Sequence, residues 1–425
     1  MEKEEWSGMF GFILASIASA IGIGNIWRFP YIMGVSGGGA FVFAYLVVVI
    51  VIGLPLMLLE FSAGKRFRLS AFNTFKKIDK KYRALALIPV VTVFFIMSYY
   101  LVITGWTLSY SIDALTGNYK PFDLFANSYL PLIFAVISLF VPVGIVMFGV
   151  RRGIENSSKI LIPVLFLILI IIVIQTLSFP NSIEGIKYYF NPDFSKLVDY
   201  RIWLLASAQA LFSLSVGYGI LLTYGSYTTK KIDILKSSLI IVFSDTIVAL
   251  LAAVSLFATI YSFNLPPSEG TELAFVVLPQ IFQAIKFGSI TGPLFFLLLF
   301  IAAVTSVISM LEVVVKNVKD YFSFSRAKAT MVVLIPLLLV SSIVSLSYTQ
   351  HLKVNLLEIM DNLFGNFMTL ISAFVISVFL SWKIKRPFEK EMGIKGFLYH
   401  TVEISIKFVI PIMLAILLLI RLFGE

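Results

Sequence analysis

The sequence predicts an all-α polytopic membrane protein, and three observations carry this prediction. Hydrophobic residues make up 59% of the 425 residues and charged residues only 13%, whereas soluble domains contain roughly 45–50% apolar and about 25% charged residues. The apolar residues gather in stretches of about 20, which is the length that a helix needs to cross the hydrocarbon layer. Basic residues concentrate in alternate short loops, as in chains that cross a membrane repeatedly.

Eleven apolar stretches are predicted to be transmembrane helices, because charges or turn residues bound each of them. They cover residues 9–33, 40–60, 84–116, 129–150, 158–178, 202–224, 234–263, 287–315, 329–348, 364–382 and 401–421. The first stretch runs into Arg28 and Pro30 without a small-residue cleavage signature, so we expect a retained helix and no removable signal peptide. The longer loops 179–201 and 264–286 either cap an outer vestibule or simply join helices.

The loop charges set the expected orientation. The side that begins with Lys3 carries most of the basic residues, in clusters within residues 65–83, 151–159, 230–236, 316–328 and 383–395. Few lie in the opposite loops, among them Lys120 and Lys187. Cytoplasmic loops retain excess Lys and Arg, so we expect a multi-pass protein of the plasma membrane with a cytoplasmic N-terminus and an external C-terminus.

Composition also argues against several classes of function. A net charge of +10 would suit a nucleic-acid partner in a soluble protein, but here the basic residues lie in short loops between apolar segments, so the bilayer is the expected partner. The chain has no Cys and only two His, which excludes disulfides, thiol chemistry and His-rich metal sites. We expect no enzyme activity, because no nucleophile with a base lies at membrane depth, and no obligate protein partner is evident.

Two predicted spans carry residues that a simple membrane anchor does not need. The first contains Gly22, Gly24 and Asn25, and the sixth contains hydroxyl residues followed by Gly217 and Gly219. Unpaired backbone costs several kcal/mol in hydrocarbon, so such segments are tolerated where they line a cavity. Spans one and six each begin a group of five, which favours two inverted five-helix repeats with corresponding broken helices around a midplane site. Close packing through small residues is the alternative.

Several ionisable residues lie within or beside the spans, where each costs about 2.5–3.5 kcal/mol unless it finds a partner. Arg28 and Asp361 share an outward depth, so we expect a pair that closes the outer path, or a purely structural ion pair. Glu60 and Glu312 are interpreted as buried partners of loop or helix-end N–H groups.

A series of motifs in these spans resembles the neurotransmitter:sodium symporter family, which includes a bacterial leucine transporter. The motifs follow the family's order and cover nearly the whole chain: Gly22–Pro30 with Gly37–Phe41, Gly53–Met57 with Glu60, Tyr99-Tyr100 with Gly105–Leu108, Phe212–Ser215 with Gly217–Gly219, Ala302–Ser306, and Met360-Asp361. The resemblance implies that residues 7–178 form the first repeat, residues 202–382 the inverted second repeat, and residues 398–421 an eleventh helix.

The resemblance implies two sodium sites. The first would use the Ala20 carbonyl and the side chains of Asn25, Ser213 and Asp245, together with the substrate carboxylate. The second would use the carbonyls of Ala18, Ile21 and Ala302 and the hydroxyls of Thr305 and Ser306. The family commonly has Asn where this chain has Asp245, and a fixed carboxylate there would replace a chloride ion. We therefore expect transport that does not require chloride.

The resemblance also implies a substrate pocket. The amides around Ile23 and Gly24, with the Tyr100 hydroxyl, would meet a carboxylate, while backbone carbonyls of Ser213 and Ser215 would meet an ammonium. Ala20 would also belong to the pocket. The walls of the pocket would be Ile96, Phe212, Tyr218, Ser306 and Met310. Gly22 stands where amine-carrying relatives place an acid, which favours a neutral aliphatic or aromatic amino acid as substrate.

Gates follow from the same resemblance. Arg28 with Asp361 is similar to the outer gate, and Asp320 with Lys3 and Tyr227 is similar to the inner one. Lys lacks the bidentate fork of Arg, so a looser inner latch is expected.

These residues predict a sodium-coupled symporter that imports a neutral amino acid by alternating access. Two alternatives stay open at this point. One is a proton-coupled carrier or exchanger on the same fold, in which Asp245 or Glu312 titrates. The other is a receptor that binds an amino acid without transporting it.

Overall fold

The computed structural model describes residues 4–264, 273–349 and 354–423, and this part of the chain is helical with no strand. The helices of the first half are α1 (Met9–Ala20), α2 (Phe29–Val35), α3 (Gly39–Val48), α4 (Leu54–Phe67), α5 (Ala71–Ile78), α6 (Leu87–Thr116), α7 (Phe122–Ala126), α8 (Leu130–Met147) and α9 (Asn156–Leu177). Those that follow are α10 (Ser182–Phe190), α11 (Tyr200–Ser213), α12 (Ile220–Gly225), α13 (Ile234–Ser262), α15 (Leu278–Ala284), α16 (Gly288–Phe322), α17 (Arg326–Leu346), α18 (Leu356–Met360), α19 (Thr369–Trp382), α20 (Glu389–Met392), α21 (Gly396–Ile404) and α22 (Ile410–Phe423).

Short π-helical or 3₁₀ segments continue or join many of these helices. They are Gly24–Arg28, Val49–Gly53, Lys80–Ala86, Val150–Glu155, Phe194–Val198, Leu273–Val277, Asp361–Met368 and Ser405–Val409. Several predicted spans therefore consist of two helices joined by such a segment, as α18 and α19 are joined by Asp361–Met368.

The helices agree with the predicted crossings. Nine helical stretches within the described residues are long and apolar enough to span a bilayer, and the bent pair Met9–Ala20 and Gly24–Val35 adds a tenth. The remaining predicted span is α11 with α12, which the six residues Leu214–Gly219 divide into pieces too short to cross alone. α9 ends at Leu177 and α11 begins at Tyr200, two residues before the predicted start of the second repeat at residue 202.

Local sequence explains where several long helices begin and end. The Asp233 carboxylate accepts the backbone N–H of Lys236 at 3.0 Å and caps α13, and Ser325 caps α17 in the same way. Such caps satisfy N–H groups that have no partner inside the helix. α6 ends at Thr116 and is followed by Gly117, whose φ of 71° is accessible to glycine at little cost.

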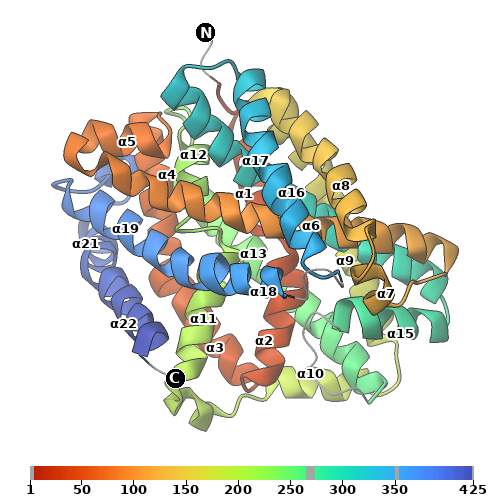
Figure 1. Ribbon diagram of the computed structural model, residues 1–425. Helices are drawn as coiled ribbons and strands as arrows, with labels where there is room; N and C mark the ends of the chain where they lie inside the picture. Colours follow the sequence, from red (N-terminus) through yellow and green to blue (C-terminus); the bar gives the residue numbers. More distant parts are fainter. Residues whose placement is uncertain (1–3, 265–272, 350–353, 424–425) are drawn as a thin grey trace.

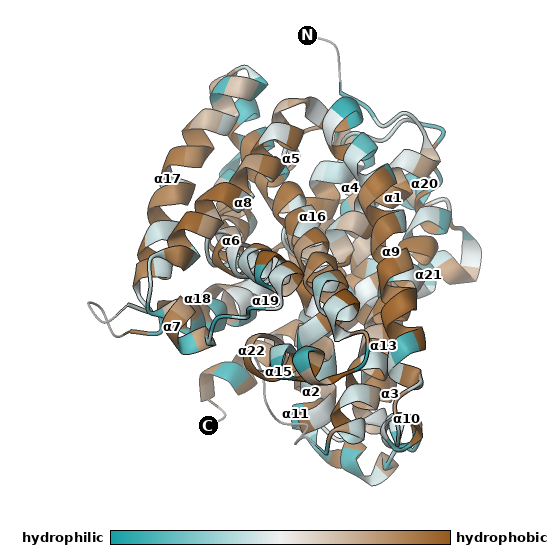
Figure 2. Ribbon diagram, turned by 90° about the vertical axis from the view of Figure 1, so that its right-hand side faces the viewer, coloured by the Kyte–Doolittle hydropathy of each residue, from teal (hydrophilic) through white to brown (hydrophobic). Residues whose placement is uncertain are grey.

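The central helices are those that build the site. In α16 the most apolar window is 78% buried inside the protein, against 28% for the stretch formed by α21 and α22. α1, α6 and α16 lie in the middle of the bundle, whereas α22 lies at its edge (Figure 1). Apolar residues predominate along the long helices and polar residues gather at their ends (Figure 2), as expected for helices surrounded by lipid.

Candidate functional site

The first break separates α1 from the π-helical segment Gly24–Arg28 in the middle of a span. Ile21 is extended, with φ −73° and ψ 108°, and the two halves of the span differ in direction by 53°. The side chain of Asn25 closes the break, because its Oδ1 accepts the Gly22 N–H at 3.0 Å. A Cβ on Gly22 would lie 2.7 Å from the Ser306 Oγ and 2.8 Å from the Tyr100 hydroxyl. Glycine is therefore required for α6 and α16 to approach this break.

The second break lies between α11 and α12. Ser215, Gly217 and Gly219 all have positive φ, at 53°, 87° and 73°, so the helix is interrupted between α11 and α12. The Gly217 N–H donates to Glu60 Oε1 at 2.6 Å, and the Gly217 carbonyl accepts a hydrogen bond from the Ser372 hydroxyl. Glu60 is thus the partner of a loop N–H, as predicted.

Three side chains from three elements meet where the two breaks face each other. The Asn25 Nδ2 donates to the Ser213 Oγ at 2.9 Å and to Asp245 Oδ1 at 2.7 Å. The Ser213 hydroxyl donates to Asp245 Oδ2 at 2.8 Å. All three are buried, and Tyr45 adds a fourth group, with its hydroxyl 3.4 Å from Asp245 Oδ2. The predicted position of Asp245 on the seventh span therefore brings its carboxylate to the first candidate sodium site.

The residues of the second candidate sodium site lie on α1 and α16. The Thr305 hydroxyl is 3.0 Å from the carbonyl oxygens of Ile301 and Ala302, and Ser306 donates to the Ala302 carbonyl at 3.2 Å. Both hydroxyls donate back to their own helix, which is common for Thr and Ser in apolar helices. Each keeps lone pairs for a cation, and Ala18 lies in the last turn of α1 while Ile21 directly follows this helix.

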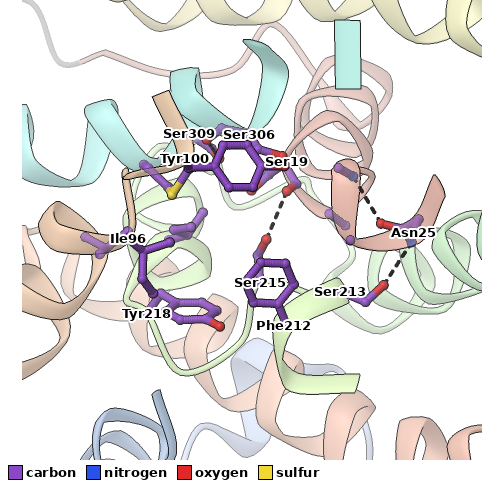
Figure 3. A pocket seen from close by; sticks show the side chains of 16 residues that line it. Ser19, Asn25, Ile96, Tyr100, Phe212, Ser213, Ser215, Tyr218, Ser306 and Ser309 are labelled. Atoms are coloured by element: carbon purple, nitrogen blue, oxygen red, sulfur yellow. Dashed lines mark hydrogen bonds between the residues drawn. The ribbon is translucent and has the colours of Figure 1, made fainter. Parts of the chain in front are cut away.

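A cavity of about 40 Å³ lies between the two breaks. Backbone and hydroxyl groups line one part of it, and the Ile23 N–H donates to the Tyr100 hydroxyl at 3.0 Å. Its lining contains Ala20, Gly22, Gly24, Ile96, Phe212, Ser213, Ser215, Tyr218, Ser306 and Met310, all expected from the sequence, and also Ser19, Val93, Ile220 and Ser309. Figure 3 shows Ser215 hydrogen-bonded to Ser19 across the cavity, with Ile96 and Tyr218 on another side.

A vestibule of about 560 Å³ begins next to the cavity, and Gly24, Tyr100 and Phe212 line both. Arg28 and Asp361 line this vestibule but form no ion pair among the described residues. The Arg28 guanidinium donates to Gln209 Oε1 at 3.1 Å and to Asn366 Oδ1 at 2.9 Å, and it lies 5.0 Å above the Phe212 ring. Asp361 accepts from the Tyr99 hydroxyl at 2.7 Å. Asn366 therefore stands between the two residues of the predicted outer gate.

The family follows from comparison with known proteins. The model of the sodium:neurotransmitter symporter family matches residues 3–130 and 130–424. The chain belongs to this family. Uncharacterized sodium-dependent transporters of Methanocaldococcus jannaschii (36% identity, 90% of this chain and 82% of the relative) and Haemophilus influenzae (30% identity, 99% of each) are similar along their length. The crystal structure of MhsT in complex with L-phenylalanine matches with a TM-score of 0.91 at 34% identity, covering 98% of this chain and 99% of MhsT.

The symporter is thus a sodium-dependent membrane transporter and not an enzyme. Its helices form the inverted-repeat fold of the bacterial leucine transporter, with the first and sixth spans broken. The predicted family and fold are confirmed.

A network of charged side chains lies at the end of the symporter opposite the vestibule, near the first described residues. Arg326 pairs with Glu4 at 2.6 Å and with Glu312 at 2.6 Å, and Glu312 also accepts a hydrogen bond from the Tyr227 hydroxyl. The interpretation of Glu312 as a partner of N–H groups is therefore wrong. Arg326 is the first residue of α17, and the reach of its side chain back to Glu312 on α16 is not visible in the sequence.

The structure describes two of the three residues of the predicted inner gate. Lys3 lies outside the described residues. The Asp320 carboxylate accepts the backbone N–H of Ser70 at 3.0 Å, and it borders a cavity of about 350 Å³ that Tyr227 also lines. Tyr227 lies beside this region, as predicted, with Lys316 Nζ 4.0 Å from the centre of its ring.

Several polar residues of the site escaped the sequence analysis. Gln209 links the two breaks, because its Nε2 donates to the Gly24 carbonyl at 3.0 Å while its Oε1 accepts from Arg28. Asn366 bridges the outer gate, and Ser309 lines the cavity. Gln209 opens the motif-bearing stretch of the sixth span, so a polar amide at membrane depth was the available signal.

Proposed function

We propose that the symporter imports a neutral amino acid, aliphatic or aromatic, together with sodium by alternating access. The observation that carries this proposal is the composition of the small cavity. Peptide groups and hydroxyls line one part, apolar side chains line the rest, and none of the described residues in its lining carries a charged side chain. A zwitterion without side-chain charge has complementary chemistry, because its own two charges would meet the broken helix ends.

The substrate carboxylate would be held at the first break. The N–H groups around Ile23 and Gly24 open the helical segment that follows, and the N-terminal end of a helix favours an anion. Tyr100 already contacts this backbone through the Ile23 N–H. The ammonium would be met by the carbonyls of Ala20 and Ser213, which are the last residues of α1 and α11, and of Ser215 in the second break.

One sodium ion would be bound among Asn25, Ser213 and Asp245. Hard cations prefer oxygen ligands, and the Ser213 Oγ lies within 3.0 Å of both Asp245 carboxylate oxygens. Asn25 would contribute its amide oxygen, which accepts the Gly22 N–H and keeps a lone pair for a cation. A second sodium would use Thr305, Ser306 and the carbonyls of Ala18, Ile21 and Ala302, where α1 meets α16.

The choice of an amino acid as substrate has further support. MhsT, which is 34% identical over nearly the whole chain, was crystallised with L-phenylalanine. Gly22 has no side chain to pair with a free amine, and the space for a Cβ is already taken by Ser306 and Tyr100. These two observations favour a ligand that brings its own carboxylate to this position.

Chloride would not be required. Asp245 supplies one negative charge beside the proposed sodium, at a position that is fully buried and hydrogen-bonded on both oxygens. A chloride ion in the same region would bring a second negative charge and repel the first.

The gates would act at the two ends of the site, in a plasma membrane with the N-terminus in the cytoplasm. Displacement of Asn366 would let Arg28 contact Asp361 directly and close the vestibule above a bound substrate. Asp320, Lys3 and Tyr227 would then open the other side.

A binding screen with and without sodium tests the proposal. Purified symporter is titrated with the neutral amino acids in sodium and in potassium buffers, and sodium is expected to increase the affinity for at least one of them. Asn25→Ala should abolish the sodium effect, whereas the exposed Asn127→Ala should keep it. Sodium-independent binding by the unaltered protein would contradict the proposal.

Reconstituted uptake separates the alternatives. A sodium gradient at constant pH should drive accumulation of the amino acid in proteoliposomes. Accumulation driven only by a pH gradient would indicate a proton-coupled carrier, and binding without accumulation would indicate a receptor.

A further inference from the structure

Eight exposed basic side chains gather at one corner of the molecule, on the side that carries most of the basic loops. They come from α5, from the segment Lys80–Ala86 that follows it, and from the chain between α19 and α21. We call this set the basic corner: Lys76, Lys77, Lys80, Lys81, Arg83, Lys385, Lys390 and Lys395. Among the described residues, none of the eight lies within ion-pair distance of an acid.

Specific contacts join the two segments that carry these cations. Lys383 Nζ lies 3.0 Å from Asp79 and 4.4 Å from the centre of the Tyr82 ring. The rings of Phe75 and Phe379 stack at 4.1 Å. α5 and α21 accordingly lie on the same side of the bundle (Figure 1). The basic corner is therefore a joined surface, although its members are some 300 positions apart in the sequence.

The acidic residues next to the basic corner already form ion pairs with other side chains. Asp79 pairs with Lys383, Glu391 with Arg66 at 2.6 Å, and Glu389 with Arg386 at 3.7 Å. No carboxylate of these three is left to neutralise the eight cations. The surface keeps an uncompensated positive charge that a partner from outside the chain can meet.

Exposed apolar side chains border the basic corner and show where the bilayer reaches it. Trp382, Phe397 and Leu398 are 59%, 88% and 52% exposed, and the Trp382 indole donates to the Lys407 carbonyl at 2.7 Å. Trp and other amphipathic rings mark the boundary between hydrocarbon and headgroups. The cations next to them lie at the level of the lipid headgroups.

We propose that the basic corner binds anionic phospholipid headgroups of the adjoining leaflet. Clusters of Lys and Arg beside a membrane-spanning helix attract acidic lipids, and the attraction falls off within about a Debye length. Exposed lysines on a surface bordered by aromatic and apolar groups fit a lipid, whose chains enter the bilayer while its phosphate stays beside the cations. This interaction is independent of the substrate and of sodium.

Lipid retention in purified protein tests the proposal. Full-length symporter is assembled in nanodiscs of phosphatidylcholine with phosphatidylglycerol, extracted, and analysed by native mass spectrometry for bound lipid. The variant Lys76→Gln, Lys77→Gln, Lys80→Gln, Lys81→Gln should lose phosphatidylglycerol binding by roughly tenfold or more, because each basic residue contributes to the attraction. The matched control changes four exposed cations of other basic loops, Arg151, Arg152, Lys230 and Lys231, to Gln and should stay within about twofold of the unaltered protein.

The remaining arms identify the ligand and exclude misfolding. Replacing the same four lysines by Arg should restore binding, because charge is kept. Equal losses in the test and control variants would overturn the proposal in favour of a diffuse attraction. Loss of phosphatidylglycerol on adding an equal concentration of inorganic phosphate would show that the corner takes a soluble anion instead. Retention unchanged by Lys→Gln would overturn the proposal as well.

Discussion

At the scale of single residues, the centre of the site depends on a glycine that leaves room for its neighbours. Gly22 lies where a Cβ would meet the hydroxyls of Ser306 and Tyr100. Its N–H also binds Asn25, so the same residue connects the cavity to the cluster proposed for sodium. A side chain here would separate α1 from both α6 and α16.

Gly22→Ala should weaken sodium-dependent amino-acid binding by at least about tenfold, because atoms 2.7–2.8 Å apart must move. Gly144→Ala is the matched control, since nothing lies within 4 Å of a Cβ at that helical position, and alanine favours a helix. Isothermal titration calorimetry in sodium buffer measures the amino-acid affinity of both variants. Equal affinities in the two variants would show that the substrate does not approach Gly22.

Asp245→Asn should make uptake dependent on chloride. The substitution keeps the shape of the side chain but removes the negative charge that lies within hydrogen-bond distance of Ser213 and Asn25, so an anion is needed in its place. Uptake in proteoliposomes is measured with chloride or gluconate as the anion. We expect no difference for the unaltered protein and a loss of roughly tenfold or more in gluconate for the variant, about 1.4 kcal/mol per tenfold. A variant that is equally active in both buffers would contradict this role.

Residue types identified most of the site, but not its cross-links. Asn25 and Asp245 carry polar or ionisable groups at membrane depth, which is costly without a partner, and the family resemblance grouped them with Ser213 in one site. Asn366 also lies in a predicted span, but its contact with Arg28 was not predictable, because the two residues are 338 positions apart. Ser309 lies one helical turn from Ser306 on α16 and follows from the periodicity only once the facing side of that helix is known.

At the scale of elements, each broken helix is held by groups from outside it. The second break depends on Glu60, Ser372 and the absence of a side chain at Gly217, where a Cβ would lie 2.6 Å from the Cβ of Ala373. Small residues in the sequence predicted the break. The side chains that hold it, Glu60 and Ser372, lie on α4 and α19, and their contacts with the break are visible only in the structure.

Gly217→Ala should lower the melting temperature and abolish transport. The variant combines two costs, an unfavourable positive φ of about 1–2 kcal/mol and a clash with α19 of about 1–3 kcal/mol. Gly117→Ala separates the cost of the positive φ from the cost of the clash. The φ of Gly117 is also positive, at 71°, but nothing lies within 4 Å of a Cβ there. Fluorescence-detected melting should show a smaller shift for Gly117→Ala, with transport retained. Equal shifts would mean that α19 does not restrain the break.

The network at the opposite end ties the start of the chain to α17. Burial opposes ionisation of Glu4, but its hydrogen bonds and charge interactions with Arg326 and Lys319 outweigh burial and lower the pKa of Glu4 below its ordinary value of 4.5. A carboxyl group with a lowered pKa in the folded protein stabilises it above its ordinary pKa and loses this contribution as the pH falls.

Glu4→Gln should therefore destabilise the symporter by about 1–3 kcal/mol at neutral pH, where it removes charged hydrogen bonds. The difference in melting temperature between the unaltered protein and the variant should stay constant down to about pH 5 and shrink as the pH falls through the lowered pKa. Glu184→Gln removes an exposed pair with Lys187 and should have a small effect at every pH. A difference that grows on acidification would contradict the assigned direction.

At the scale of the whole molecule, apolar length and loop charge predicted the helical spans, because the bilayer imposes both on any chain that crosses it. The same constraints do not specify which end of the bundle is open. The structure shows a vestibule of about 560 Å³ reaching Gly24 and Phe212 on one side, while Glu4, Arg326, Glu312 and Tyr227 bind one another on the other side. The central cavity is therefore reached through the vestibule, as expected for one of the two states of an alternating-access carrier.

The absence of cysteine allows this arrangement to be tested directly in cells, because a single introduced Cys is the only thiol. Ala208→Cys lies in the vestibule lining, and Asn73→Cys lies in the cavity of about 350 Å³ at the other end. In the proposed orientation, with a cytoplasmic N-terminus, a membrane-impermeant maleimide should label the first variant in intact cells and the second only after permeabilisation. Sodium with the transported amino acid should slow labelling of Ala208→Cys, because a ligand that closes the gate shifts the population away from the open vestibule. Labelling of Asn73→Cys in intact cells would reverse the orientation, and a rate at Ala208→Cys that ligands leave unchanged would mean that this vestibule is not the gated path.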